Sequence, residues 1–138
     1  ALFPGCDIAI LAAAVADFTP DQVQTGKIKR SDGELNLRLK ATTDIASALG
    51  KVRKPYQIIA GFSLETSNEL QNATWKLKWK NLDLIVLNSL ADKGAGFDYD
   101  TNKITIIDKY NNIDKFELKS KDDAARDILD KIISMIEK

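Results

Sequence analysis

Lysine is the residue type whose spacing in this sequence most readily suggests chemistry. Lys27, Lys29 and Arg30 place three cations within four residues, enough to clamp a phosphate group. Lys76 and Lys80 are one helical turn apart, where like charges repel each other unless an anion lies between them. Taken singly, each pattern also fits an ordinary solvated basic surface, so both interpretations stay open.

Two further segments bring small, acidic or aromatic residues to the ends of predicted strands. Residues 12–17 read Ala-Ala-Ala-Val-Ala-Asp, where small side chains let a ligand approach the backbone and Asp17 could hold a hydroxyl, an amine or a metal-bound water. Phe62 ends another apolar run and could stack on a base. Ligands of open α/β sheets bind outside the carboxyl ends of strands. A polar strand end and a core phenylalanine are the alternative interpretations.

The composition excludes several kinds of site within these residues. The sequence has no histidine and one cysteine, Cys6, which excludes a Ser-His or Cys-His triad, an HExxH zinc site and an internal disulfide. One cysteine is typical of a reducing, cytoplasmic setting. An enzyme built from this chain would work with Lys, Asp, Asn and backbone groups, which suits positioning and charge neutralisation in phosphoryl or nucleotidyl transfer.

The overall charge and length suit one globular domain. Twenty basic and twenty acidic residues cancel, so the net charge gives no reason to expect binding to nucleic acid or an anionic membrane. No stretch approaches the roughly 18–20 apolar residues of a membrane span. The 138 residues, 44% of them hydrophobic, are enough for a single domain over residues 1–138.

Strands and helices alternate along the chain. Continuous apolar runs predict strands buried on both faces, and alternating apolar residues predict strands with one exposed face. Together these patterns predict strands at residues 7–13, 35–39, 57–62, 82–87, 103–107 and 113–118. Helices are predicted from Ile45 to Leu49 with Gly50 as the stop, from a cap at Thr66 or Ser67 to about Lys80, and from Ser120 to about Ile136. Residues 21–33 read as an exposed loop. This order predicts a Rossmann-like three-layer α/β/α fold with a mixed sheet, whose N-terminal part would precede Ala1.

Two tryptophans of the second predicted helix point away from its apolar face. Leu70, Ala73 and Leu77 share that face, whereas Trp75 and Trp79 lie on another side. Two large aromatic side chains are rarely left in water. We therefore expect them to contact a second subunit, another domain or a segment outside these residues.

Five segments follow one another in the order and spacing of a known family. Residues 12–17, 27–30, 61–66, 80–88 and 94–102 resemble the AAAVAD, KIKK, GFxxET, KNxDxIVxN and GxGFxxxxN signatures of the phosphopantothenate–cysteine ligases. The resemblance covers about residues 7–107. It implies a ligase of coenzyme A biosynthesis that joins L-cysteine to (R)-4′-phosphopantothenate through an acyl-nucleotide intermediate, acyl-CMP where CTP is used. In many bacteria this ligase is the C-terminal half of a bifunctional protein with an FMN-dependent decarboxylase.

The resemblance also implies roles for individual residues. Lys27 matches the mobile-flap lysine associated with catalysis. The residues that match the nucleotide and substrate site are Ala12, Ala13, Asp17, Thr42, Thr43, Asp44, Ile45, Phe62, Lys76 and Lys80. Thr42 and Thr43 stand where the family usually has Asn-Pro. The co-substrate would be CTP or ATP with Mg²⁺, no protein ligand set for a metal is implied, and FMN would belong only to a decarboxylase domain before Ala1.

The resemblance further implies a homodimer, in which the basic flap approaches the neighbouring subunit's site and residues 35–39 form part of the interface. The family's Gly-rich motif and the asparagine of the cysteine step would precede Ala1, so we expect the 138 residues alone to be inactive. Two other interpretations stay open. One is another Rossmann-like nucleotide- or flavin-binding domain, such as a reductase, and the other is a non-catalytic dimerisation module with solvated lysines.

Overall fold

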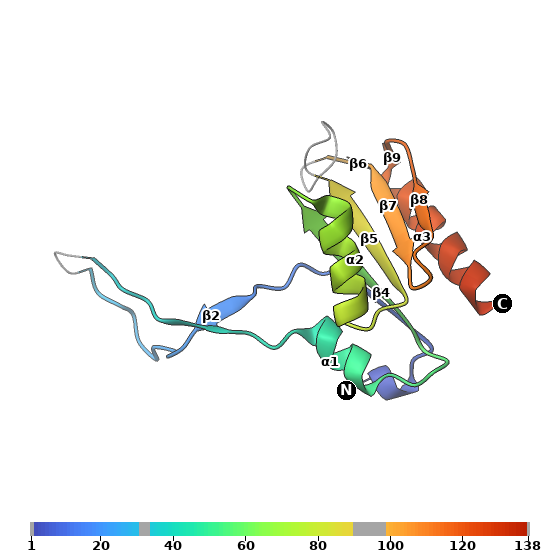
Figure 1. The fold of residues 1–138 in the computed structure, drawn as a ribbon. Helices are drawn as coiled ribbons and strands as arrows, with labels where there is room; N and C mark the ends of the chain where they lie inside the picture. The colour runs from blue at the N-terminus through green and yellow to red at the C-terminus, as the bar shows by residue number, and fades with distance from the viewer. Residues whose placement is uncertain (1, 31–33, 90–98, 138) are drawn as a thin grey trace.

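A five-stranded mixed sheet forms the centre of the computed structural model, which describes residues 2–30, 34–89 and 99–137 (Figure 1). Its strands, in the spatial order β1-β4-β5-β7-β8, are β1 (Ile8–Leu11), β4 (Ile58–Glu65), β5 (Leu84–Ser89), β7 (Ile104–Asp108) and β8 (Ile113–Lys115). The first three run parallel, and β7 and β8 are antiparallel to their neighbours. The predicted mixed sheet is confirmed. The strands β7 and β8 form a hairpin, whose turn places Asn111 at a φ of 64°.

Helices cover both faces of the sheet. The helix α3 (Lys121–Ile136) buries Ala124, Ile128 and Ile132 against one face, and its predicted cap Ser120 accepts a hydrogen bond from the Asp123 N–H. The helix α2 (Glu69–Trp79) buries Ala73 and Leu77 against the other face, with α1 (Ile45–Val52) beside it. The predicted three-layer α/β arrangement is therefore confirmed. No helix in the described part of the chain is both long enough and apolar enough to span a membrane.

The outer side of α2 carries the tryptophan pair. Trp75 and Trp79 stack with ring centroids 5.2 Å apart, and each is more than half exposed. Their predicted contact with a partner or another segment stays a prediction. The predicted cap at Thr66 or Ser67 is wrong, since α2 begins after Asn68, which adopts the left-handed conformation with a φ of 47°.

The sequence predicted that the short helix α1 stops at Gly50, and this prediction is wrong. The helix continues to Val52, and Gly50 is buried against the end of α2. A Cβ atom at Gly50 would lie 1.9 Å from the Lys80 carbonyl oxygen. The Asn81 side chain also donates a hydrogen bond of 2.7 Å to the Gly50 carbonyl. This glycine is therefore needed for close helix packing and does not mark a helix end.

Replacing Gly50 by alanine is expected to destabilise the chain. The added methyl group meets a backbone oxygen that cannot rotate away, so α1 and α2 must separate, at a cost of about 1–3 kcal/mol. This outweighs the gain in helix propensity of about 1 kcal/mol. Urea unfolding measures the difference. Gly5→Ala is the matched control, because a Cβ there meets nothing within 4 Å. Equal unfolding free energies for the two variants would contradict this packing role.

The strand β1 is not buried on both faces as predicted. Ala9 and Leu11 pack against the α2 side of the sheet, whereas Ile8 and Ile10 are about two-fifths exposed. The reason is its position at the edge of the sheet, with its other face uncovered by the described elements.

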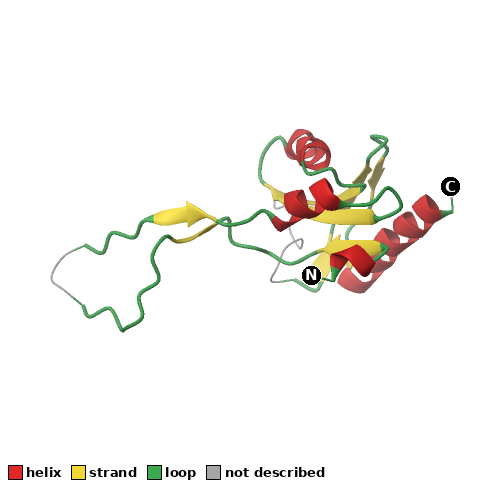
Figure 2. Cartoon of the chain, turned by 90° about the horizontal axis from the view of Figure 1, so that it is seen from below, coloured by secondary structure: helices red, strands yellow, loops and turns green. Residues whose placement is uncertain are grey.

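The chain between β1 and α1 forms a long arm that projects from the body (Figures 1 and 2). Its base is a short antiparallel ribbon of β2 (Phe18–Pro20) and β3 (Leu39–Ala41). The predicted strand at residues 35–39 is wrong except at its end, because Leu35 and Leu37 have no paired strand and are exposed. Beyond the ribbon, the predicted exposed loop is confirmed for residues 22–30.

Three small elements complete the described chain: η1 (Phe3–Gly5), and a two-residue ladder of β6 (Thr101–Asn102) with β9 (Lys119–Ser120). The segment Gly94 to Phe97, part of the family resemblance, lies outside the described residues.

Candidate functional site

The two lysines of the α2 motif each contact a carboxylate. Lys76 Nζ lies 2.6 Å from Glu65 Oε1 at the end of β4. Lys80 Nζ lies 3.1 Å from Asp44 Oδ2 at the start of α1. These pairs relieve the repulsion that the spacing of the lysines predicted. An anion between Lys76 and Lys80 stays a prediction, and it would meet ammonium groups that already have acidic partners.

Glu65 is the most enclosed member of this group, with 11% of its side chain exposed. Its carboxylate accepts hydrogen bonds from Lys76, from the Ser63 hydroxyl at 2.5 Å and from the Asn72 amide at 3.2 Å. Burial raises the pKa of Glu65, but the hydrogen bonds from Lys76, Ser63 and Asn72 outweigh it, so the pKa lies below its ordinary value. Glu65 is therefore a charged carboxylate at neutral pH.

Asp44 both begins α1 and binds Lys80. One carboxylate oxygen accepts a 2.9 Å hydrogen bond from the Ser47 N–H, as an N-cap residue does. Burial raises the pKa of Asp44, but hydrogen bonds from the Ser47 N–H and the Lys80 ammonium outweigh this effect. The pKa of Asp44 therefore also lies below its ordinary value. Asp44 thus ties the start of α1 to the end of α2.

The segment after β1 lies next to the segment before α1. The Thr42 hydroxyl donates a 2.6 Å hydrogen bond to the Ala16 carbonyl, and the Thr42 N–H donates one of 2.9 Å to the Asp17 carbonyl. Residues 12–17 and 42–45, both predicted to line the nucleotide site, are therefore neighbours. The predicted residues that the structure links by contacts or by chain continuity are Ala12, Ala13, Asp17, Thr42, Thr43, Asp44, Ile45, Lys76 and Lys80.

Phe62 does not lie with this group. Side chains alternate along β4, so Ser63 and Glu65 face α2, whereas Phe62 packs, half-buried, against the core beneath α3. Its predicted contact with the nucleotide stays a prediction, but the structure places its ring on the opposite face of the sheet from Lys76.

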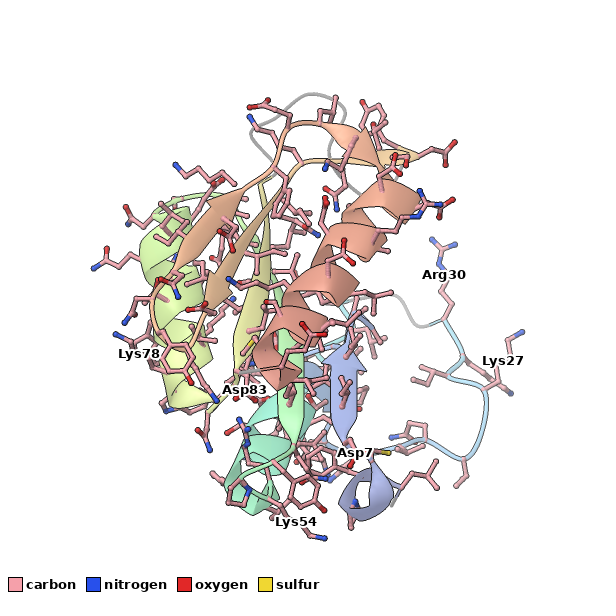
Figure 3. All side chains as sticks on the ribbon, turned by 90° about the vertical axis from the view of Figure 1, so that its right-hand side faces the viewer. Asp7, Lys27, Arg30, Lys54, Lys78 and Asp83 are labelled. Atoms are coloured by element: carbon pink, nitrogen blue, oxygen red, sulfur yellow. The ribbon has the colours of Figure 1, made fainter. Side chains whose placement is uncertain are left out.

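Lys27, the predicted catalytic residue, lies on the arm beyond the β2–β3 ribbon, as does Arg30 (Figures 1 and 3). It lines a hollow formed by the two sides of the arm itself, together with Ile28 and Leu37. A single copy of the chain therefore does not bring Lys27 to Lys76 and Lys80.

A second hollow lies at the amino ends of the parallel strands, away from the end of β4 where Glu65 lies. Asp83, fully buried, is paired there with Arg53 at 2.5 Å and Lys109 at 2.9 Å. Lys131 pairs nearby with Asp108 at 3.1 Å. These groups satisfy one another and support the fold.

Glu65 belongs to the segment 61–66 that resembles the GFxxET signature, but no role was predicted for it. None was predicted for Ser63 or Asn72 either. The sequence did contain a signal for this cluster. Glu65 follows Ser63 by two residues at a strand end, so both side chains lie on the face opposite Phe62.

The described residues contain no group of three or more His, Cys, Asp or Glu side chains that could hold a metal ion. The two carboxylates that contact Lys76 and Lys80 are Glu65 and Asp44, and each is already paired with its lysine. A Mg²⁺ ion fits this site most simply when the phosphates of a nucleotide supply most of its ligands.

Acid and alkali are both expected to destabilise the fold. Burial raises the pKa of Asp108, but Asn112 and Lys131 lower it below its ordinary value of 3.8. Burial lowers the pKa of Lys131, but Asp114 and Asp108 raise it above its ordinary value of 10.5. A lowered carboxyl pKa gives stability that is complete above the unfolded value and is lost as pH falls through the folded one. A raised lysine pKa gives stability that is lost as pH rises through the folded value.

The free energy of unfolding, measured in urea, should therefore be level between about pH 5 and pH 10 and fall on either side. Asp108→Asn should flatten the acid side of this profile. An acid side that is equally steep in that variant would contradict the assignment.

Known proteins resemble the chain along almost its whole length. The family described as "DNA/pantothenate metabolism flavoprotein C-terminal domain" matches residues 1–136. A prokaryotic protein named cysteine/cysteine sulfinic acid decarboxylase, of unknown organism, is 60% identical over 97% of this chain and 37% of its own length. The coenzyme A biosynthesis bifunctional protein CoaBC of Bacillus subtilis (strain 168) is 43% identical over 97% of this chain and 33% of its own length.

A solved structure, the C-terminal domain of a coenzyme A biosynthesis bifunctional protein CoaBC, has the same fold. It superposes with a TM-score of 0.78 at 31% identity, covering 99% of this chain and 58% of that one. The chain thus spans little more than a third of the curated relatives named above. The predicted resemblance to the C-terminal half of the bifunctional coenzyme A protein is confirmed, and the chain belongs to the DNA/pantothenate metabolism flavoprotein C-terminal domain family.

Proposed function

We propose that this chain is part of a phosphopantothenate–cysteine ligase of coenzyme A biosynthesis. The observation that carries the proposal is that Lys80, one helical turn after Lys76, pairs with Asp44 beside the Thr42 segment, which is hydrogen-bonded to residues 16 and 17, in a chain of this family. Cations gathered beside the ends of parallel strands suit a nucleoside triphosphate. The relatives named CoaBC support the pathway.

The proposed reaction has two steps. A carboxylate oxygen of 4′-phosphopantothenate attacks the α-phosphorus of CTP, and the bond to the β-phosphate oxygen breaks, releasing pyrophosphate. The amine of L-cysteine then attacks the acyl carbonyl, CMP leaves, and an amide forms with loss of the amine proton. Lys76 and Lys80 stabilise the negative charge on the phosphates in the first step, a role that requires no histidine.

The nucleotide brings Mg²⁺ to the site, where the metal neutralises charge on the triphosphate. We infer CTP as the co-substrate, with ATP as the alternative, and FMN only in a decarboxylase domain outside this chain. Lys27 acts from the arm, and its distance from Lys76 is accounted for if the protein is a cytoplasmic homodimer in which one copy's arm reaches its neighbour.

The 60% identical relative supports a second candidate for the whole protein, the decarboxylation of cysteine or cysteine sulfinic acid. That name describes a protein of which this chain covers 37%. A protein with that activity releases CO₂ from cysteine without CTP or phosphopantothenate. The two candidates are therefore separated by which substrates product formation requires.

The full-length protein should release pyrophosphate only when CTP, Mg²⁺ and phosphopantothenate are present, and should form the cysteine amide, identified by its mass, when cysteine is added. The 138 residues alone should form no product. Carbon dioxide release from cysteine without amide formation would favour the second candidate. If no product requires nucleotide, the ligase proposal is overturned. Ligation by the 138 residues alone would overturn their expected inactivity.

A further inference from the structure

Glu65 has no part in the proposed reaction, although its carboxylate is largely enclosed and accepts three side-chain hydrogen bonds. Three side-chain donors converge on its carboxylate: Ser63 from β4, and Asn72 and Lys76 from α2. Only 11% of the Glu65 side chain is exposed. A carboxylate enclosed in this way has a fixed position, because each oxygen is held by its own donor.

The same contacts fix the ammonium group of Lys76. Its Nζ donates to Glu65 Oε1 at 2.6 Å and to Ser63 Oγ at 3.1 Å. An ammonium group has three N–H donors, so these two acceptors leave one N–H for a ligand. The Lys76 side chain remains about one-third exposed, so a ligand can reach it. Lys76 has thus lost its side-chain freedom during folding and need not lose it on binding a phosphate.

A second effect of Glu65 has the opposite sign. A carboxylate next to a triphosphate repels it and competes for the same lysine. If this competition dominated, removal of the charge would tighten nucleotide binding. If positioning dominates, removal of the charge loosens Lys76 and weakens binding. The enclosed geometry favours positioning, since Ser63 and Asn72 hold Glu65 where it can bind the lysine without turning toward the ligand.

We propose that Glu65 is a positioning residue of the nucleotide site. Together with Ser63 and Asn72, it holds the Lys76 ammonium at the end of β4 with one N–H directed to the triphosphate. This inference rests on the proposed ligase function and adds to it a residue that acts through Lys76.

The test compares KM for CTP and kcat in variants of the full-length protein. Glu65→Gln keeps the size of the side chain and removes its charge. It should raise KM for CTP about tenfold, the worth of one charge-assisted hydrogen bond, and change kcat much less. Glu117→Gln makes the same chemical change at an exposed position outside the site and should leave both unchanged. A KM that is unchanged or lowered in Glu65→Gln overturns the proposal.

A double variant shows whether Glu65 acts through Lys76. Glu65→Gln combined with Lys76→Ala should have the KM of Lys76→Ala alone, because the lysine that Glu65 positions is gone. Effects that multiply would overturn the proposal while leaving the ligase function intact. A Lys76→Ala variant with unchanged kcat/KM for CTP would overturn both.

Ser63→Ala provides a second route if Glu65→Gln does not fold. It removes one acceptor of Lys76 and one donor to Glu65, so it should raise KM for CTP several-fold. An unchanged KM in a folded Ser63→Ala protein contradicts the positioning role.

Discussion

Lys76→Ala in the full-length protein is expected to lower kcat/KM for CTP by about 100- to 1,000-fold, the cost of losing one directed group that stabilises transition-state charge. The structure supports this size of effect because Lys76 is held by Glu65 and Ser63 beside the end of β4. Steady-state ligation with varied CTP measures the effect, and the melting temperature shows whether the variant is folded.

Lys78→Ala is the matched control for this prediction. Lys78 lies on the same helix two residues away and is exposed (Figure 3). Its removal should change kcat/KM for CTP less than twofold or so, as expected for an isolated surface charge. Equal losses in the two variants would mean that the general positive charge of α2 matters rather than a directed lysine.

Lys27→Ala is expected to lower kcat by about 100-fold or more with little change in KM for CTP, since a flap residue acts after the nucleotide has bound. Lys27 lies on the projecting arm (Figure 3), whereas Lys76 lies on α2 and contacts Glu65 and Ser63 of its own copy. Its effect therefore depends on which copy's site the arm reaches.

Co-expression of Lys27→Ala and Lys76→Ala copies with different tags answers that question. If the arm serves its neighbour, a mixed dimer has one intact site, and random pairing restores about a quarter of the wild-type activity. If the arm folds back on its own copy, every site lacks one lysine and activity is not restored. The second result would contradict the proposed exchange of arms.

Much of the fold could be predicted because its signals are local. The sequence predicted a helix from Ser120 to about Ile136, and α3 spans Lys121–Ile136 with Ser120 as its cap. The predicted start of α1 at Ile45 is also confirmed, and Asp44 caps it. Such periodic and capping patterns depend on residues within one element, which the sequence places side by side.

The errors in the predicted fold arise from contacts between distant segments. Gly50 has the sequence character of a helix stop, but it is required by the backbone of Lys80. Ile8 and Ile10 have the apolar pattern of a central strand, but β1 lies at the sheet edge. Leu35 and Leu37 alternate like a strand but pair with no strand among the described residues. For Gly50 and for β1, the contacts that decide the outcome involve segments remote in sequence.

The predicted site divides in the same way. The lysine spacing on α2 was visible in the sequence, and the structure links Lys80 with Asp44. The partner of Lys76 was not predicted, because Glu65 approaches it only when β4 and α2 pack together. Motifs predicted which residues belong to the site, whereas the contacts among those residues could be seen only in the fold.

A crystal structure of the full-length protein with CTP and Mg²⁺ tests the central claim most directly. It should show phosphate oxygens about 3 Å from Nζ of both Lys76 and Lys80, the distance of a charge-assisted hydrogen bond. A nucleotide bound at the amino end of the sheet beside Arg53 and Lys109, with Lys76 and Lys80 contacting only Glu65 and Asp44, would contradict it.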